Sequence, residues 1–529
     1  MKRKYVYLLF SFISQVGMVN AQHISEFNSL LPGPQETYFK LAQSHSFQYI
    51  IEWGDPLSQG GTLPNRCDFT GFVPIDRSSS IGYLSISSES QLGGVTILDV
   101  HLEKSNTEWI VDRSEYLDFS SVGGTEANCS GTVTPWGTIV TCEETTDEDL
   151  NGDGYNDLGW AIEVDPISKV VIDQNGGLEG GDKLWALGNF KHENLVIHSN
   201  RRTAYQGVDD AEGYLFKFVA DIQEDLSAGK LFVYKGSKNG SGEWLILNNS
   251  TVSEQNSTLI QCAELGATQF LGIEDVEINP IDGRVYLAVK NEGQVYRFED
   301  SDPITGTTVS NFETYVGDTT YEISNGEITL IEQWGIGNDN LVFDEKGNLW
   351  VAQDGGNNYL WIVENGHTQS TPKVKIFAQA PIGSEPTGMT FTPDYKYLFM
   401  SIQHPDSDND LSTQLDAFNI PRKFDKDVAL VIALNENLNQ TVTSIAELKD
   451  LEPVLYPNPS NEFVRLKFVK ESIPTNIQLF DSKGNKLNVH YKTVNQEIQV
   501  SIANIPAGIY YLNFINNGNL NSNKLIIRK

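Results

Sequence analysis

The chain of 529 residues is poor in basic side chains, because 37 Lys and Arg stand against 70 Asp and Glu and the formal net charge is −33. Binding to nucleic acid through phosphate neutralisation needs the opposite balance, so that class of function is excluded. Cysteine is scarce too, with only four residues, at positions 67, 129, 142 and 262. A scaffold held by many disulfides is therefore excluded, while one or two disulfides stay open.

Long apolar runs are missing beyond the first 21 residues, so we expect no membrane span in the mature chain. The N-terminus itself has the order of a secretory signal peptide: a basic start (Met1 to Lys4), an apolar run (Tyr5 to Val19) and a small residue, Ala21. We predict that residues 1–21 are removed on export. An N-terminal membrane anchor is the alternative, which the shortness of the apolar run disfavours.

Helical periodicity is nearly absent, whereas short runs rich in Val, Ile, Tyr, Phe and Trp alternate with Gly-containing turns. One hairpin pattern occurs three times, over residues 274–288, 339–352 and 387–400. A hairpin of this kind cannot bury its own face, and its repetition is typical of β-propeller blades. The sequence predicts an all-β chain that forms a β-propeller, with insertions in the loops between unevenly spaced copies.

The last 80 or so residues differ in composition and form a separate module. Its markers are Tyr456-Pro457-Asn458-Pro459, Gly484, Gly508-Ile509-Tyr510 and the basic end 524–529. The module resembles the C-terminal sorting domain of the type IX secretion pathway. The resemblance implies a small β-sandwich, the type IX machinery as a partner, and export through the periplasm to the cell surface or medium. We therefore predict three segments: the signal peptide 1–21, a propeller 22–450 and a sorting domain 451–529.

The segment 128–144 ends in Cys142-Glu143-Glu144. A thiolate followed by two carboxylates combines soft and hard anionic ligands, which suits a higher-valent or mixed metal centre better than a plain magnesium site. By itself such a triplet is more often a buried thiol beside solvated acids.

Together with segments at 188–194, 213–219, 274–275, 339–340, 383–388 and 401–405, this motif resembles the PhoX-type alkaline phosphatase family over about residues 60–410. The resemblance implies a β-propeller whose axial cavity holds iron and calcium ions and hydrolyses phosphate monoesters, a small-molecule substrate class. It places the catalytic iron on Cys142, Glu193 and Glu274. The same resemblance gives calcium or bridging roles to Glu143, Glu144 and Glu385.

Several positions depart from the family pattern. Gly272 and Ile382 stand where arginines are usual, Asn189 replaces the arginine of a Gly-Arg-Phe pattern, and Ser87-Ser88-Glu89 replaces Asn-His-Glu. Arginine pairs well with phosphate dianions, so we consider Lys191 and His192 as substitute substrate-binding residues. The departures leave two alternatives open: a metal-stabilised binding propeller without activity, and a calcium-dependent lactonase-like hydrolase.

A second metal motif spans residues 149–157, with oxygen donors at Asp149, Asn151, Asp153 and Asp157 and a glycine at the sharp turn, Gly154. This is the spacing of a calcium loop, although Trp160 stands where an EF-hand has glutamate. We predict one structural calcium ion there; a turn without an ion is the alternative. Motifs of serine hydrolases, zincins and P-loop NTPases are absent, which excludes those classes.

Overall fold

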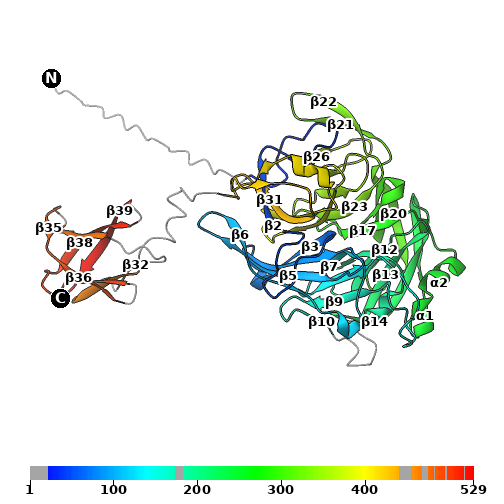
Figure 1. Cartoon of the computed structure of the whole chain (residues 1–529), viewed down its shortest axis with the longest axis horizontal. Coiled ribbons are helices and arrows are strands. Elements are labelled where there is room, and N and C mark those ends of the chain that lie inside the picture. The colour runs from blue at the N-terminus through cyan, green and yellow to red at the C-terminus, as the bar shows by residue number, and fades with distance from the viewer. Residues whose placement is uncertain are drawn as a thin grey trace, which may run out of the picture. The chain divides into compact units, whose positions relative to one another are not determined.

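The computed structural model describes residues 22–172, 183–439, 454–456, 458–467, 475–481, 483–494, 497–516 and 519–529. The predicted signal peptide, residues 1–21, lies outside this part. Two compact units divide at residue 440, and Figure 1 draws the first from blue to yellow and the second from orange to red.

The first unit is a β-propeller with six antiparallel four-stranded blades in the described residues. The innermost strands are β3 (Cys67–Pro74), β7 (Asn128–Val133), β11 (His192–Ile197), β17 (Ile273–Ile278), β23 (Asn338–Phe343) and β27 (Glu385–Phe391). Each of them contacts the next, and β27 returns to β3, which closes a ring around the axis. The predicted propeller is confirmed, and the three hairpin copies are the inner hairpins of its last three blades.

The remaining strands of each blade follow outward in order. The second strands are β4 (Ile81–Ser88), β8 (Ile139–Glu143), β12 (Thr203–Val208), β18 (Val285–Val289), β24 (Leu349–Gln353) and β28 (Tyr397–Gln403). The third strands are β5 (Val95–Glu103), β9 (Ala161–Asp165), β13 (Gly213–Ile222), β19 (Gln294–Asp300), β25 (Tyr359–Val363) and β31 (Val428–Leu434). The outer strands are β6 (Glu108–Tyr116), β10 (Val170–Val171), β14 (Asp225–Gly236), β20 (Thr308–Gly317), β26 (Val374–Gln379) and β2 (His45–Glu52).

The ring is closed by chain segments far apart in sequence, because β2 from the N-terminal part pairs with β31 in the sixth blade. Such pairing protects the edges that an open sheet would expose. Aromatic side chains fill the spaces between blades. Phe72 of the first blade stacks on Phe399 of the sixth at 5.3 Å, and Trp109 packs against both rings.

Insertions sit outside the blades, as the uneven spacing predicted. They include β15 (Gly240–Ile246), which joins the third and fourth blades through β14 and β20, and the hairpin of β21 (Thr320–Ser324) and β22 (Thr329–Gln333). Smaller pieces are β1 (Lys40–Leu41), β16 (Gln269–Phe270), β29 (Gln414–Leu415), β30 (Pro421–Arg422), α1 (Val252–Asn256) and α2 (Thr258–Leu265). Five single turns of 3-10 helix complete the unit: η1 (Ile75–Arg77), η2 (Ser120–Val122), η3 (Trp185–Leu187), η4 (Lys290–Glu292) and η5 (Ser407–Leu411).

The second unit is a β-sandwich of two four-stranded sheets, as predicted. One sheet contains β32 (Val454–Tyr456), β33 (Phe463–Lys467), β37 (Glu497–Ser501) and β36 (His490–Val494). The other contains β35 (Lys486–Leu487), β34 (Thr475–Asp481), β38 (Gly508–Asn516) and β39 (Asn519–Ile527). Buried Val464, Leu479, Leu512 and Leu525 form part of its own core.

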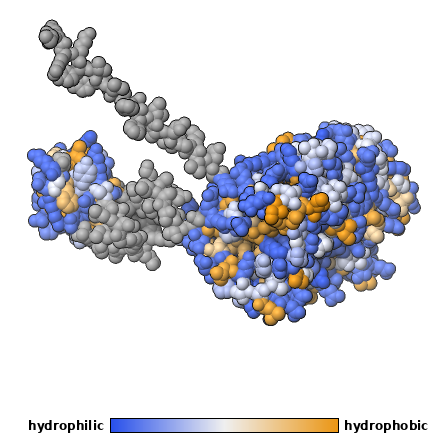
Figure 2. All heavy atoms as spheres, turned by 90° about the horizontal axis from the view of Figure 1, so that it is seen from above, coloured by the Kyte–Doolittle hydropathy of each residue, from blue (hydrophilic) through white to orange (hydrophobic). Residues whose placement is uncertain are grey.

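Hydrophilic residues cover most of the visible surface, with apolar residues in smaller patches between them (Figure 2). No helix among the described residues has the length and apolar character that a membrane crossing requires. The four cysteines are buried free thiols in this structure, so the disulfides left open by the sequence are not formed.

Candidate metal centre

Each inner strand brings one acidic or thiol side chain to the same level of the propeller axis. The residue is the first or second of its strand: Asp68, Cys129, Glu193, Glu274, Asp339 and Glu385. We call this set the axial ring, and all six residues are buried. Each strand pairs irregularly with its blade neighbour next to this level. Such bulges re-aim side chains, which explains how six strands point reactive groups at one axis.

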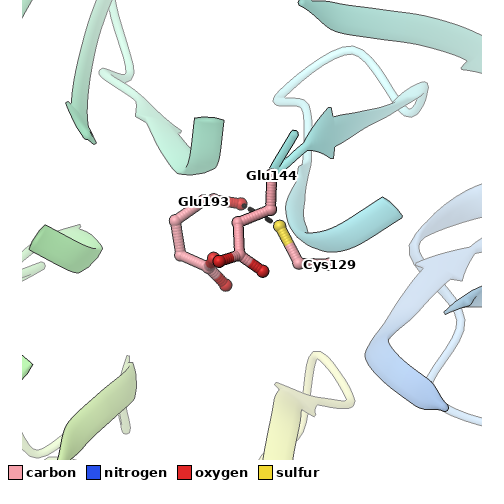
Figure 3. A group of neighbouring side chains, drawn as sticks. All are labelled: Cys129, Glu144 and Glu193. Carbon is pink, nitrogen blue, oxygen red and sulfur yellow. Dashed lines mark hydrogen bonds between the residues drawn. The ribbon is translucent and has the colours of Figure 1, made fainter. Parts of the chain in front are cut away.

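Three side chains meet on one side of the axial ring (Figure 3). Cys129, Glu193 and Glu144, which directly follows β8, each offer a ligand atom, and these atoms lie within 4.8 Å of one another. The Cys129 thiol lies 3.2 Å from the carbonyl oxygen of His192. One soft and two hard donors therefore converge from the second and third blades.

Two more groups of the same size extend the axial ring. Glu193, Glu274 and Asp339 come together from three consecutive inner strands, so Glu193 belongs to two groups. Asp354, Glu385 and His404 form the third group, in which His404 Nε2 lies 3.1 Å from Glu385 Oε2.

The carboxylates of these groups carry charges of the same sign, which repel one another. Burial raises the pKa of the Glu193 carboxyl well above its ordinary value, and repulsion from Glu274 and Glu144 raises it further. Burial and repulsion from Glu89 raise the pKa of Glu144 to about 9 and that of Asp68 to about 7. Carboxylates packed in this way share protons unless a multivalent cation compensates them. The donor set therefore fits a bound metal.

A second polar layer beneath the axial ring locks the inner strands together. Asp275 Oδ2 accepts a hydrogen bond from Leu341 N at 2.6 Å, and Asn194 Oδ1 accepts one from Val276 N at 2.9 Å. Asn340 Oδ1 accepts from the amide of Gly388. A cavity of about 160 Å³, bordered by residues of all six inner strands, continues along the axis at this level. The candidate ligands therefore lie next to a layer in which hydrogen bonds connect neighbouring inner strands.

Comparison with known proteins identifies the fold and its chemistry. The model of the alkaline phosphatase PhoX family matches residues 104–406, more than half of the chain. The chain belongs to the PhoX alkaline phosphatase family. It is thus a phosphatase that hydrolyses phosphoric monoesters. The secretion system C-terminal sorting domain matches residues 454–528, which makes it an exported protein, at the cell surface or secreted, that engages the type IX machinery.

A solved PhoX structure agrees on the fold. PhoX of Pseudomonas fluorescens, in complex with the transition state analogue vanadate, is 19% identical, with a TM-score of 0.59, and the match covers 79% of this chain and 99% of that one. A regucalcin from Agrobacterium tumefaciens is 12% identical over 73% of this chain and 94% of its own, with a TM-score of 0.33. No curated protein matches the chain.

The structure separates the members of the PhoX-like Cys142-Glu143-Glu144 motif. Cys142 lies on β8 within the apolar cluster around Val140 and Ala161 and offers no ligand atom to the three groups. Glu143 Oε1 accepts a hydrogen bond from Lys183 Nζ at 2.7 Å, and its Oε2 accepts from the amides of Gly159 and Trp160. Of the three, Glu144 is the member of a candidate ligand group, and it lies on the opposite side from Glu143 because neighbouring residues of a strand point to opposite sides.

The two residues considered for substrate binding also differ. His192 is buried, its ring stacks on Phe190 at 3.8 Å, and its Nε2 bonds to the carbonyl of Gly188. Burial lowers the pKa of His192 to about 4, so it is a neutral core side chain. The half-exposed ammonium of Lys191 lies 3.6 Å from Asp210.

The positions that depart from the PhoX pattern have their own roles. Gly272 has a φ of +81°, and a side chain there would meet Asp209 Oδ1. Asn189 donates to the carbonyls of Leu158 and Gly159, and Glu89 lies 3.6 Å from Arg66. Ser87 and Ser88 are fully buried, and Ile382 is partly exposed.

The acidic loop forms the turn that its sequence predicts. Asp149 accepts hydrogen bonds from the amides of Gly152 and Gly154, and Asn151 and Asp153 each accept from the amide two residues ahead. One carboxylate oxygen of Asp157 is buried and has no hydrogen-bond partner. The loop joins β8 to β9; residues 149–154 are exposed and residues 155–157 are half-buried.

Sequence reasoning missed Cys129, Asp68, Asp339, Asp354 and His404 as members of the site. A signal for Asp339 was present, because it occupies the same place in its hairpin copy as Glu274 does in the preceding one. Asp354 and His404 directly follow the second strands of their blades, as Glu144 does, a shared place that becomes visible only once the strands are known.

Proposed function

We propose that this exported phosphatase uses iron and calcium ions held on the propeller axis. The observation that carries the proposal is the convergence of Cys129, Glu144 and Glu193 from two blades, with no Lys or Arg among the described residues paired to any of them. A buried anionic set without an internal counterion keeps its charge only when an external cation compensates it.

The donor types favour different ions at different places. Thiolate is a soft ligand, so Cys129 with Glu144 and Glu193 suits iron, whereas carboxylates such as Glu274, Asp339 and Glu385 suit calcium. We retain Glu144, Glu193, Glu274 and Glu385 from the ligands that the sequence predicted. Cys129 takes the place of Cys142, and Glu143 is left out because Lys183 already neutralises it.

Bound ions of this kind supply Lewis-acid activation of the phosphate and an activated oxygen nucleophile. The chain contributes a fixed arrangement, since the second polar layer holds neighbouring inner strands together. Blade packing excludes water from the sides of the site, so the ester enters along the axis. Lys191, on the loop before the Glu193 strand, is our candidate for an early contact with the phosphate dianion.

We also propose one structural calcium ion in the loop 149–157, held by Asp149, Asn151, Asp153 and Asp157. Support comes from the oxygen spacing and from the buried Asp157 oxygen without a partner. In addition we propose removal of residues 1–21 in the periplasm, with a propeller over 22–450 and the sorting domain over 451–529.

The experiment that tests the catalytic proposal measures p-nitrophenyl phosphate hydrolysis by the mature chain, with metal content determined on the same samples. Chelation of calcium should abolish turnover, and Glu274→Gln should lose metal and activity together. Turnover that survives chelation with undiminished rate contradicts the proposal. Iron-loaded but inactive protein would redirect the search to lactones or to a binding role.

A further inference from the structure

Lys290 is the one lysine or arginine of the described residues that ion-pairs with members of the three metal-ligand groups. Its ammonium lies 2.9 Å from Glu274 Oε1 and 3.4 Å from Asp354 Oδ2. Glu274 belongs to the axial group with Glu193 and Asp339, and Asp354 belongs to the group with Glu385 and His404. Lys290 thus links two of the three groups, while the Cys129 group has no such partner.

The backbone holds Lys290 firmly in this position. Its amide donates to the carbonyl of Gly272 at 2.9 Å, and its carbonyl accepts from the amide of Gly337 at 2.9 Å. These glycines precede β17 and β23, the strands that carry Glu274 and Asp339. Lys290 therefore starts η4 between the two loops that lead into the axial ring, and its position is built into the fold.

The surroundings of the ammonium are those of a cation site. Burial opposes the charge on Lys290, but Glu274, Asp339, Glu385 and Asp354 outweigh burial and raise its pKa. The Glu274 Oε1 atom is buried, and the Lys290 ammonium lies 2.9 Å from it. The interaction is chiefly one of charge, as between a metal ion and its carboxylates.

We infer that the ammonium of Lys290 takes the place of one divalent cation between Glu274 and Asp354. A divalent ion at that position would stand next to a fixed positive charge, so the site accepts one ion fewer than its carboxylates otherwise would. The inference rests on the proposed function in that it takes the acidic groups as metal ligands. It adds that one cation of the cluster is part of the polypeptide and cannot be removed by chelation.

The test compares bound divalent ions per chain in the full mature protein and its variants, after equal loading with calcium and iron and removal of unbound metal. Lys290→Met keeps the length of the side chain and removes its charge, and we expect one additional calcium ion per chain. Lys290→Arg keeps the charge and should match the unmodified protein. Lys346→Met removes an exposed lysine whose ammonium lies 2.7 Å from Glu26, outside the three ligand groups, and its metal content should not change.

A double variant distinguishes a specific effect on metal binding from simple misfolding. Lys290→Met combined with Asp354→Asn removes the charge and one of the two carboxylates together, and the ion count should return to that of the unmodified protein. An unchanged or lower count in folded Lys290→Met overturns the inference, as does a gain in Lys290→Arg equal to that in Lys290→Met. The proposed function is judged separately, by metal and turnover in the unmodified protein, so its failure can be distinguished from failure of the inference about Lys290.

Discussion

Glu143 and Glu144 are adjacent in the chain, yet they lie in two opposite electrostatic regions of the propeller. On the flank of the second blade, Glu143 is fully buried and has Lys183 and two backbone amides as partners. On the axis, Glu144 faces Glu89, Glu274 and Asp209, each of which raises its pKa. In the first region the polypeptide itself compensates the buried charge. In the second region the charge is compensated only when cations bind.

The comparison separates structural from functional acids. A buried carboxylate with an internal partner stabilises the fold, and its loss should leave metal binding intact. A buried carboxylate among other carboxylates costs stability in the metal-free chain and acts by binding metal. The distinction would be wrong if loss of a paired carboxylate abolished metal binding, or if loss of an axial carboxylate left metal binding intact.

The largest effect is expected at the thiols. Cys129→Ser removes the soft ligand from the axis, and we expect loss of iron and a fall in kcat/KM of about 1,000-fold, or about 4 kcal/mol. Cys142→Ser changes the other thiol of the same β-hairpin, which belongs to none of the three candidate ligand groups, so iron and activity should persist. Metal analysis and p-nitrophenyl phosphate kinetics on both variants decide between them. The reverse outcome would return the ligand role to Cys142.

The next largest effect is expected on stability, at the pair of Lys183 and Glu143 on the flank of the second blade. Lys183→Met leaves the Glu143 charge buried without its partner, which should lower the free energy of unfolding by about 3–5 kcal/mol. Adding Glu143→Gln should restore most of that loss. Both proteins should still bind metal on the axis, and denaturant unfolding with metal analysis measures this. Metal loss that accompanies Lys183→Met in the folded protein would show that the two regions are not separate.

Much of the fold was predictable from the sequence. The three hairpin copies correspond to β17–β18, β23–β24 and β27–β28. Their sequence patterns are alike because each blade must bury its apolar faces against neighbouring blades in the same way. The first three blades were not recognised as copies. Their hairpins lack the Pro/Asp-x-x-Gly turn, and long insertions separate them.

The site was predictable only in part, because a one-residue shift decides which side chain reaches the axis. The sequence places Glu143 and Glu144 side by side and offers two cysteines in one hairpin. The bulge in β7 spans Cys129 and re-aims its side chain, and bulges leave no clear local signal in a sequence. Lys183 is 40 residues from Glu143 in sequence, so no spacing could reveal that this acid was already paired.

A smaller effect is the pH dependence of the metal-free protein. The folded-state pKa of Glu144 is raised from 4.5 to about 9, so the folded chain holds a proton that the unfolded chain releases. Stability should therefore be full below about pH 4.5 for this group and should fall as the pH rises toward 9. Thermal unfolding across this range measures the effect. Glu144→Gln should flatten the dependence, and bound metal should suppress it. A stability that rises with pH would contradict the assignment.

The smallest effect is expected in the loop 149–157, which extends the comparison to an exposed acidic site. Here the carboxylates face solvent and backbone amides, so loss of an ion should cost little. Asp153→Asn should reduce calcium-dependent stabilisation by about 1 kcal/mol, a shift in Tm of about 2 °C, with activity retained. Asp147→Asn, just before the loop, is the matched control and should have no effect. An equal calcium response in both variants would mean that the loop is a turn without an ion, and that the axis alone in this propeller requires metal.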